Sequence, residues 1–91
     1  MAVTDRPTFT LEVVTPERIA YTGAVATVVA PATDGAVGIR AHHAPMLVTL
    51  GPGRIVVRDP AGATTVLQSQ GGGFLEVFHN RVTILAERLA A

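Results

Sequence analysis

Three histidines are the residues of this chain with the most specific potential chemistry. His42 and His43 are adjacent, and His79 lies much later in the sequence. A zinc-type site needs three or four converging ligands, so Asp34 or His79 would have to converge on the His42–His43 pair from elsewhere. Consecutive residues of an extended segment point to opposite sides, which makes the His42–His43 pair a poor chelator. The pattern favours a loop in which one imidazole packs or forms a hydrogen bond and the other faces solvent, and no metal site is predicted.

Nucleophilic and acid–base catalysis find little support in the sequence. Ser69 is the only serine, and no Gly-x-Ser-x-Gly elbow surrounds it. A triad also needs a histidine and an acid within hydrogen-bond reach of that hydroxyl, which the spacing does not indicate. The carboxylates are spread over separate segments and are expected to be solvated. We therefore predict no catalytic residue.

The glycine run Gly71-Gly72-Gly73 resembles a phosphate-binding loop only superficially. Such a loop leads into a helix and carries a lysine with a serine or threonine. Here the run leads into Phe-Leu-Glu-Val, and the chain has no lysine. The run instead predicts a bend or a close strand crossing, where a side chain would not fit. No cofactor is predicted.

The elements that would position these residues are short β-strands separated by turn residues. Phe9, Leu11 and Val13 alternate with polar residues, which is typical of a half-buried strand. Gly23 predicts a break, Gly51-Pro52-Gly53 a stronger one, and His79-Asn80 a tight hairpin. The predicted strands are residues 8–13, 18–21, 24–30, 37–39, 46–50, 54–58, 63–69, 74–78 and 81–86. This spacing predicts one all-β domain over residues 1–91, a flattened antiparallel sandwich or barrel of about ten short strands.

The last residues have a different composition. The segment Ile84–Ala91 contains good helix formers, but eight residues are too few for a stable isolated helix. We expect a strand end followed by a frayed turn.

Composition excludes several classes of function. The chain is 48% hydrophobic and 15% charged, so disorder is not expected. Its net charge is zero and its arginines are scattered along the sequence, which argues against a nucleic-acid partner. The absence of cysteine removes disulfides and thiolate metal sites. Neither a signal peptide nor an apolar run long enough to span a membrane is evident, although peripheral association with a membrane complex requires neither.

The segment from Met46 to Leu50 allows two interpretations. Met46, Leu47, Val48 and Leu50 are all apolar, and the simpler interpretation places all four in the core. A strand that is apolar on both sides can instead bury one side against a partner, where methionine adapts well. The pattern alone does not separate these alternatives.

Four ordered motifs resemble a known family. They are Gly-Ala-Val-Gly-Ile followed by His-His-Ala-Pro-Met-Leu, then Leu-Gly-Pro-Gly, then Gly-Gly-Phe-Leu-Glu-Val, and then Val-Thr-Ile-Leu-Ala-Glu. Their order and spacing are similar to those of the epsilon subunit of bacterial F-type ATP synthase, and the likeness extends from about Phe9 to Glu87. The start, Leu-Glu-Val-Val-Thr-Pro-Glu, also resembles the first strands of that family.

The resemblance implies a non-catalytic rotor part rather than an enzyme. The N-terminal domain of the family is a flattened ten-stranded β-sandwich. It sits at the foot of the central stalk, bound to the gamma subunit and resting on the membrane ring of c subunits. The resemblance thus implies a peripheral protein at the cytoplasmic face of the cell membrane, coupling ion translocation to ATP synthesis. A rigid sheet with two well-fitting faces would suffice for that task.

The resemblance also assigns expected contacts, residue by residue. The positions expected to face gamma are Thr15, Met46, Leu47 and Val48. Those expected to meet the c-ring are Asp34, Gly35, Ala36, His43, Ala44 and Pro45. Two departures bear on the ring contact. Ala36 stands where the family often has glutamate, and Arg40-Ala41-His42 replaces its usual aromatic or leucine, proline and glycine.

A further expectation concerns length. Members of the family commonly continue into an inhibitory two-helix hairpin, which this sequence lacks, so we expect coupling without helical inhibition of ATP hydrolysis. Two other classes of protein stay open from the residues. One is a free-standing β-sandwich adaptor with another partner. The other is a small metal-binding protein built around His42, His43 and His79.

Overall fold

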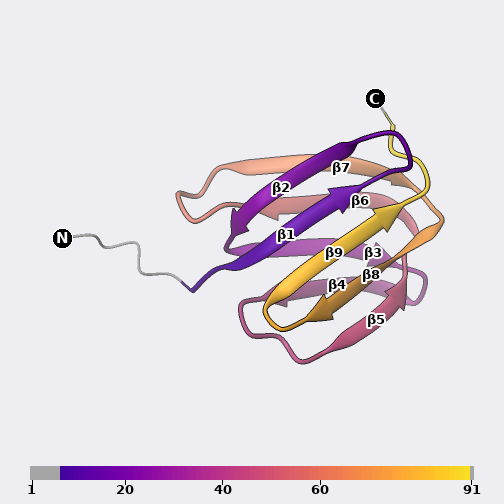
Figure 1. The fold of residues 1–91 in the computed structure, drawn as a ribbon. Coiled ribbons are helices and arrows are strands. Elements are labelled where there is room, and N and C mark those ends of the chain that lie inside the picture. Colours follow the sequence, from indigo (N-terminus) through magenta and orange to yellow (C-terminus); the bar gives the residue numbers. More distant parts are fainter. Residues whose placement is uncertain (1–6, 91) are drawn as a thin grey trace.

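The structure, a computed structural model, describes residues 7–90 and consists of strands in two facing sheets (Figure 1). Sheet A has five strands in the order β2-β1-β9-β8-β5, and sheet B has four in the order β4-β3-β6-β7. The strands are β1 (Phe9–Val14), β2 (Ile19–Val25), β3 (Thr27–Ala32), β4 (Gly35–Arg40), β5 (Met46–Thr49), β6 (Pro52–Arg58), β7 (Thr64–Gln70), β8 (Gly73–Phe78) and β9 (Arg81–Ala86).

The predicted all-β sandwich is confirmed, with two differences in detail. The described residues form nine strands rather than about ten. The sheets are also not purely antiparallel, because β1 and β9 pair in parallel. On their other sides β1 pairs antiparallel with β2 and β9 with β8, so the parallel pair lies inside sheet A.

The core lies between the sheets and is built from alternate residues of nearly every strand. In β1, Phe9, Leu11 and Val13 point inward and are buried, as the alternation predicted. Burial of each such side chain contributes about 1.5–3 kcal/mol relative to exposure. The largest fully buried side chains are Leu11, Ile39, Leu50, Ile55, Leu75, Ile84, Val13, Val25, Val28, Val57, Val77 and Val82. An aliphatic core of this kind fixes the positions of both outer faces.

One predicted interruption is misplaced, and another is present but shorter than predicted. Gly23 lies inside β2, and the interruption comes at Ala26, where the chain passes from sheet A to sheet B. The amide of Ala26 donates to the carbonyl of Arg58 at 2.9 Å, so the crossing is anchored by sheet B. At the second break, β6 already begins at Pro52. A proline is tolerated there because the first residue of a strand can do without the missing N–H.

Two turns behave as predicted. His79 and Asn80 join β8 to β9 with φ values of 52° and 60°, the left-handed conformation that both central residues of a two-residue type I′ turn require. The glycine run marks a close strand crossing. A Cβ on Gly73 would meet the backbone carbonyl of Leu85, and one on Gly72 would meet the side chain of Glu87.

The C-terminal segment is ordered differently from the prediction. β9 ends at Ala86, as expected, but the residues after it are not a frayed turn. The amide of Ala90 donates to the carbonyl of Gln68 at 2.9 Å, and the amide of Gln70 donates to the carbonyl of Arg88 at 3.1 Å. Leu89 forms a β-bridge with Ser69, so this segment lies against β7. Within residues 7–90 there is no helix that could cross a membrane.

Candidate interaction surfaces

An apolar row crosses the outer face of sheet A. It contains Phe74, Leu85, Val14 and Ile19, which are cross-strand partners on β8, β9, β1 and β2. Three of them are large and exposed: Phe74 by 45%, Leu85 by 38% and Ile19 by 61%. We call these four residues the sheet A row. Contiguous exposed apolar side chains of this kind are typical of a protein contact surface.

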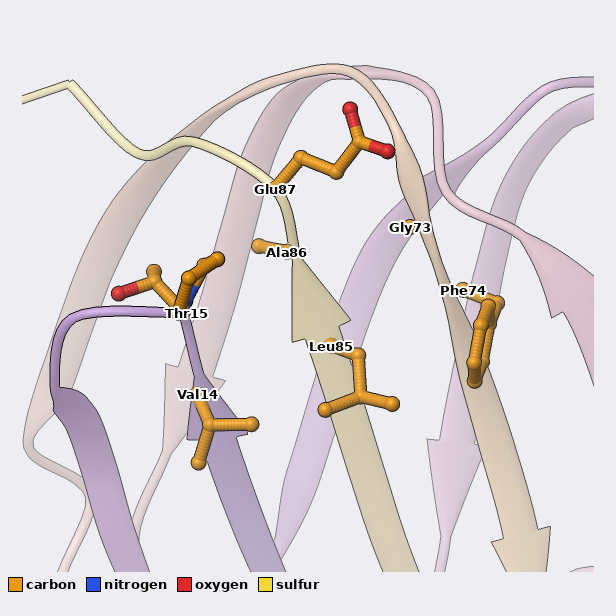
Figure 2. Close-up of a pocket in the computed structure, with 8 residues that line it drawn as sticks. Val14, Thr15, Gly73, Phe74, Leu85, Ala86 and Glu87 are labelled. Carbon is orange, nitrogen blue, oxygen red and sulfur yellow. The ribbon is translucent and has the colours of Figure 1, made fainter.

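A groove of about 280 Å³ lies along this row and is lined by Phe74, Leu85 and Val14 (Figure 2). The side chains of Val14 and Leu85 stand side by side on their strands, with Phe74 on the next strand. Glu87 adds a carboxylate at the upper rim. The groove is thus a shallow apolar depression with a charged edge, which suits an apolar side chain of a partner better than a reactive substrate.

Thr15 lies in this groove, at the end of β1. Its Oγ1 accepts hydrogen bonds from the amides of Glu17 and Arg18, each at 3.2 Å, and so shapes the turn into β2. The structure thus places Thr15, which was expected to face gamma, beside the sheet A row. Its hydroxyl also has a local structural role that the sequence did not reveal.

The predicted contact segment on β5 divides between surface and core. Leu47 is 67% exposed and pairs with Glu76, whose side chain is also exposed on sheet A. Met46 and Val48 are half-buried and pack against the core. Leu50, the fourth apolar residue of this segment, is buried, so Leu47 alone among the four presents a largely exposed side chain.

The edge strands β4 and β5 lie on the same side of the sandwich (Figure 1), and the residues expected to meet the c-ring lie on β4 or in the loops that flank it. A groove of about 350 Å³ at this edge is lined by residues of both predicted sets: Asp34, Gly35, Ala36, Leu47 and Val48. His43, Ala44 and Pro45 lie beyond the other end of β4, in the loop leading to β5. The residues expected to meet the c-ring therefore lie at the two ends of one edge and do not form a single patch.

Asn80 holds the His43 loop in place. Its Oδ1 accepts a hydrogen bond from the amide of His42 at 2.7 Å, and its Nδ2 donates to the carbonyl of Thr8 at 2.9 Å. One side chain in the β8–β9 turn thus ties the loop after β4 to the residue preceding β1. The sequence identified Asn80 only as a turn residue.

The histidines do not converge. His43 donates from Nδ1 to the carbonyl of its neighbour Ala44 at 2.7 Å. His79 stacks on Phe78 with ring centroids 3.9 Å apart. No group of three or more His, Cys, Asp or Glu side chains within residues 7–90 is placed to hold a metal ion.

Ser69 has a structural position. It is buried in β7, donates from Oγ to the carbonyl of Gly51 at 3.0 Å and accepts from the amide of Gly71 at 3.1 Å. The hydroxyl therefore links the end of β7 to the crossing between β5 and β6. Both hydrogen bonds are made to backbone groups, so the arrangement is that of a structural tie.

Sequence reasoning missed the sheet A row. The signal was present in the strands: Phe74 and Leu85 occupy the positions that alternate with the buried Leu75 and Ile84. A single apolar residue at an outward position is common on protein surfaces and indicates no contact by itself. The row became visible only when the strand order brought these positions side by side.

A comparison with protein-family models identifies the domain. Residues 8–91 match the model described as ATP synthase, Delta/Epsilon chain, beta-sandwich domain. The chain belongs to this family. The resemblance recognised from the four motifs is thereby confirmed, and with it the assignment to a non-catalytic component of ATP synthase.

Relatives support the same assignment. The ATP synthase epsilon chain of Micrococcus luteus is 43% identical over 76 residues, covering 84% of this chain and 82% of the relative. That of Caulobacter vibrioides is 45% identical over 74 residues, covering 81% and 84%. The epsilon chain 1 of Thiobacillus denitrificans is 45% identical over 80 residues, but this match spans only 57% of that longer protein.

Solved structures show the same fold. The chain superposes with a TM-score of 0.84 on a chain of the Euglena gracilis mitochondrial ATP synthase, solved as OSCP/F1/c-ring, at 21% identity and covering 91% of this chain and 52% of that one. A chain of the Tetrahymena thermophila mitochondrial ATP synthase central stalk and c-ring gives 0.75 at 18% identity, covering 89% and 64%.

Proposed function

We propose that this chain is a rotor subunit of an F-type ATP synthase that links the gamma subunit to the c-ring. Family membership and the epsilon chains that it resembles support a place in the central stalk. The two structural neighbours come from assemblies described as F1/c-ring and central stalk/c-ring. In this role the chain couples ion translocation to ATP synthesis without performing chemistry, as a peripheral protein at the cytoplasmic face of the membrane.

The gamma contact is proposed on the outer face of sheet A. The sheet A row is the observation that supports this placement. Thr15 lies beside the row, and Leu47 lies on the edge strand of the same sheet. Leu47 is the most exposed of the large hydrophobic residues. Desolvated apolar side chains near the centre of a contact usually dominate its free energy. We therefore expect Leu85 and Phe74 to contribute most.

The ring contact is proposed along the β4–β5 edge. Asp34, Gly35 and Ala36 lie in and after the turn at one end of β4, and His43, Ala44 and Pro45 lie in the loop at the other. Asp34 supplies a carboxylate, and the free edge supplies backbone donors and acceptors, which suit polar loops of a partner. Ala36 supplies only a methyl group where the family often has a carboxylate, so Asp34 is expected to be the main charge at its end.

The sandwich can transmit torque because it is stiff. Its two sheets enclose a close-packed aliphatic core, and interiors of this density have low compressibility. The Asn80 bridge ties the His43 loop to the middle strands of sheet A through Thr8 and the β8–β9 turn. A force applied at the β4–β5 edge is thereby carried across the sheet to the gamma face.

Copurification with the gamma subunit tests the first contact. Leu85→Asp would place an unpaired charge at the centre of the proposed interface, and we expect at least a tenfold loss of affinity, about 1.4 kcal/mol or more. Val66→Asp is the matched control, since Val66 is 51% exposed on the opposite sheet. Gamma binding that survives Leu85→Asp but not Val66→Asp would overturn the placement. Failure of the unmodified chain to bind gamma would favour the free-standing adaptor instead.

Single-cysteine cross-linking tests the second contact. The chain has no native cysteine, so each introduced thiol is unique within it. Asp34→Cys and Ala44→Cys, at the two ends of the edge, are expected to cross-link to c-subunit loops in assembled membranes. Thr65→Cys on β7, the far edge of sheet B, is the control. Ring cross-links from Thr65→Cys with none from the other two would refute the proposed orientation.

A further inference from the structure

The outer face of sheet B is basic. Its strands contain three arginines, Arg40, Arg54 and Arg58, all exposed, and no aspartate or glutamate. The strands of sheet A contain Glu12, Glu76 and a single arginine. The outward strand positions of sheet B are therefore basic, and Asp34 and Asp59 lie in the adjoining β3–β4 and β6–β7 turns. Three of the arginines that are scattered along the sequence thus share one face of the folded domain.

The arginines flank an apolar centre. Cross-strand pairing aligns Arg40, Thr27, Arg58 and Thr64 in one row across β4, β3, β6 and β7. The next outward row on the same strands contains Gly38, Val29, Val56 and Val66. Val29 is 42% exposed and Val66 is 51% exposed. On the other side of the valine row, Arg54 pairs with Gln68.

The geometry of these rows defines a complementary partner. Neighbouring strands lie about 4.8 Å apart, so the backbones of Arg40 and Arg58 are about 10 Å apart, and the valine row runs about 7 Å away. Every charged side chain on the face is a guanidinium, which only donates, and the threonine hydroxyls beside it can donate as well. A partner must therefore bring acceptors on its flank and apolar side chains at its centre.

We propose that the outer face of sheet B is a docking surface for an acidic amphipathic protein segment. Its apolar stripe covers Val29, Val56 and Val66, and its carboxylates meet Arg40 and Arg58 on one flank and Arg54 on the other. Guanidinium–carboxylate pairs can be bidentate, which gives register as well as attraction. The surface lies on the opposite side of the sandwich from the sheet A row, so the inference does not depend on the proposed gamma contact.

A protein segment fits this face better than a nucleic acid or an anionic membrane. The outward positions of the four strands carry no aromatic residue on which a base could stack. Three arginines around a valine row also fall short of the clusters of four to eight cations typical of anionic lipid binding. Short, stiff valines at the centre suit side chains that pack in fixed register across a sheet.

Titration with a designed peptide tests the proposal. The probe is a synthetic helix of about five turns with a leucine stripe flanked by glutamates, and a second peptide has lysines in place of the glutamates. Backbone amide NMR of the full chain would report the site. We expect saturable shifts on β3, β4, β6 and β7 with the acidic peptide only. Shifts confined to sheet A, or equal binding of the two peptides, would overturn the proposal.

Charge reversal supplies the second measurement. The double variant Arg40→Glu/Arg58→Glu is expected to weaken the acidic peptide about tenfold or more. Arg81→Glu on sheet A is the matched control and is expected to leave binding unchanged. All three side chains are exposed, so folding is not at issue. Equal weakening of peptide binding by both variants would refute specific binding to the outer face of sheet B. Binding of phosphatidylglycerol vesicles through Arg40 and Arg58, without peptide binding, would replace the protein partner with a lipid surface.

Discussion

Asn80 offers the sharpest test of how the fold positions its contact loop. The change Asn80→Ala removes two hydrogen bonds, one from the amide of His42 and one to the carbonyl of Thr8. It also places alanine at a φ of 60°, which asparagine adopts far more readily. Three separate contributions are therefore lost with one side chain.

The expected loss follows from their environments. The hydrogen bond to His42 is solvent-exposed and contributes about 0.5 kcal/mol, whereas the partly buried one to Thr8 contributes about 1 kcal/mol. The left-handed backbone adds about 1 kcal/mol. Asn80→Ala should thus lower the free energy of unfolding by about 2.5 kcal/mol. In a domain of this size that corresponds to a fall in Tm on the order of 10 °C.

Urea denaturation and hydrogen exchange at the His42 amide measure the two parts separately. Asn80→Gly, which accepts the same φ without strain, should recover about 1 kcal/mol of stability while leaving the His42 amide as exchangeable as in Asn80→Ala. Asn80→Asp keeps the acceptor Oδ1 and should retain protection at His42. Unchanged exchange at His42 in Asn80→Ala would refute the bridge, and equal stability of the alanine and glycine variants would refute the backbone contribution.

Three further predictions follow from single positions and their matched controls. Ser69→Ala should cost about 2 kcal/mol of unfolding free energy, because the buried carbonyl of Gly51 and the partly buried amide of Gly71 lose their partner; wild-type stability in urea would contradict this. Gly73→Ala should lower the free energy of unfolding by at least about 2 kcal/mol, because its Cβ clashes with the backbone of β9. The control is Gly38→Ala, whose Cβ meets only a side chain at 3.9 Å and should change the free energy of unfolding by no more than about 0.5 kcal/mol. Leu47→Asn should weaken gamma binding with little change in Tm, and Met46→Asp should lower Tm; the reverse pattern would exchange their assigned positions.

The sequence predicted the local structure well where that structure depends on residues within a single strand or turn. The alternation around Leu11 places that residue in the core, and the positive φ values of His79 and Asn80 agree with the predicted tight hairpin. The glycine run was predicted to mark a close crossing, and a Cβ at Gly73 would indeed meet β9. Each of these outcomes depends on residues close together in the chain or on simple steric exclusion.

What escaped prediction depends on strand order. The break at Ala26 rather than Gly23 exists because the chain changes sheets there, and its partner Arg58 is distant in sequence. The same holds for both outer faces. Leu85 acquires Val14 as a neighbour, and Arg40 aligns with Arg58 across Thr27, only through long-range pairing. Periodicity shows that a residue points outward, but not which outward residues stand beside it.

The parallel pair β1–β9 has a consequence for biosynthesis. Thr10 pairs with Arg81, so β1 joins a strand that is synthesised about 70 residues later, and both occupy the interior of sheet A. Closing so long a loop makes folding intrinsically slow. Sheet A stays incomplete until translation has passed Ala86, and until then the apolar residues of β1 have no neighbour on one side. Deleting β1 or β9 would therefore remove an interior strand of sheet A and not an edge strand.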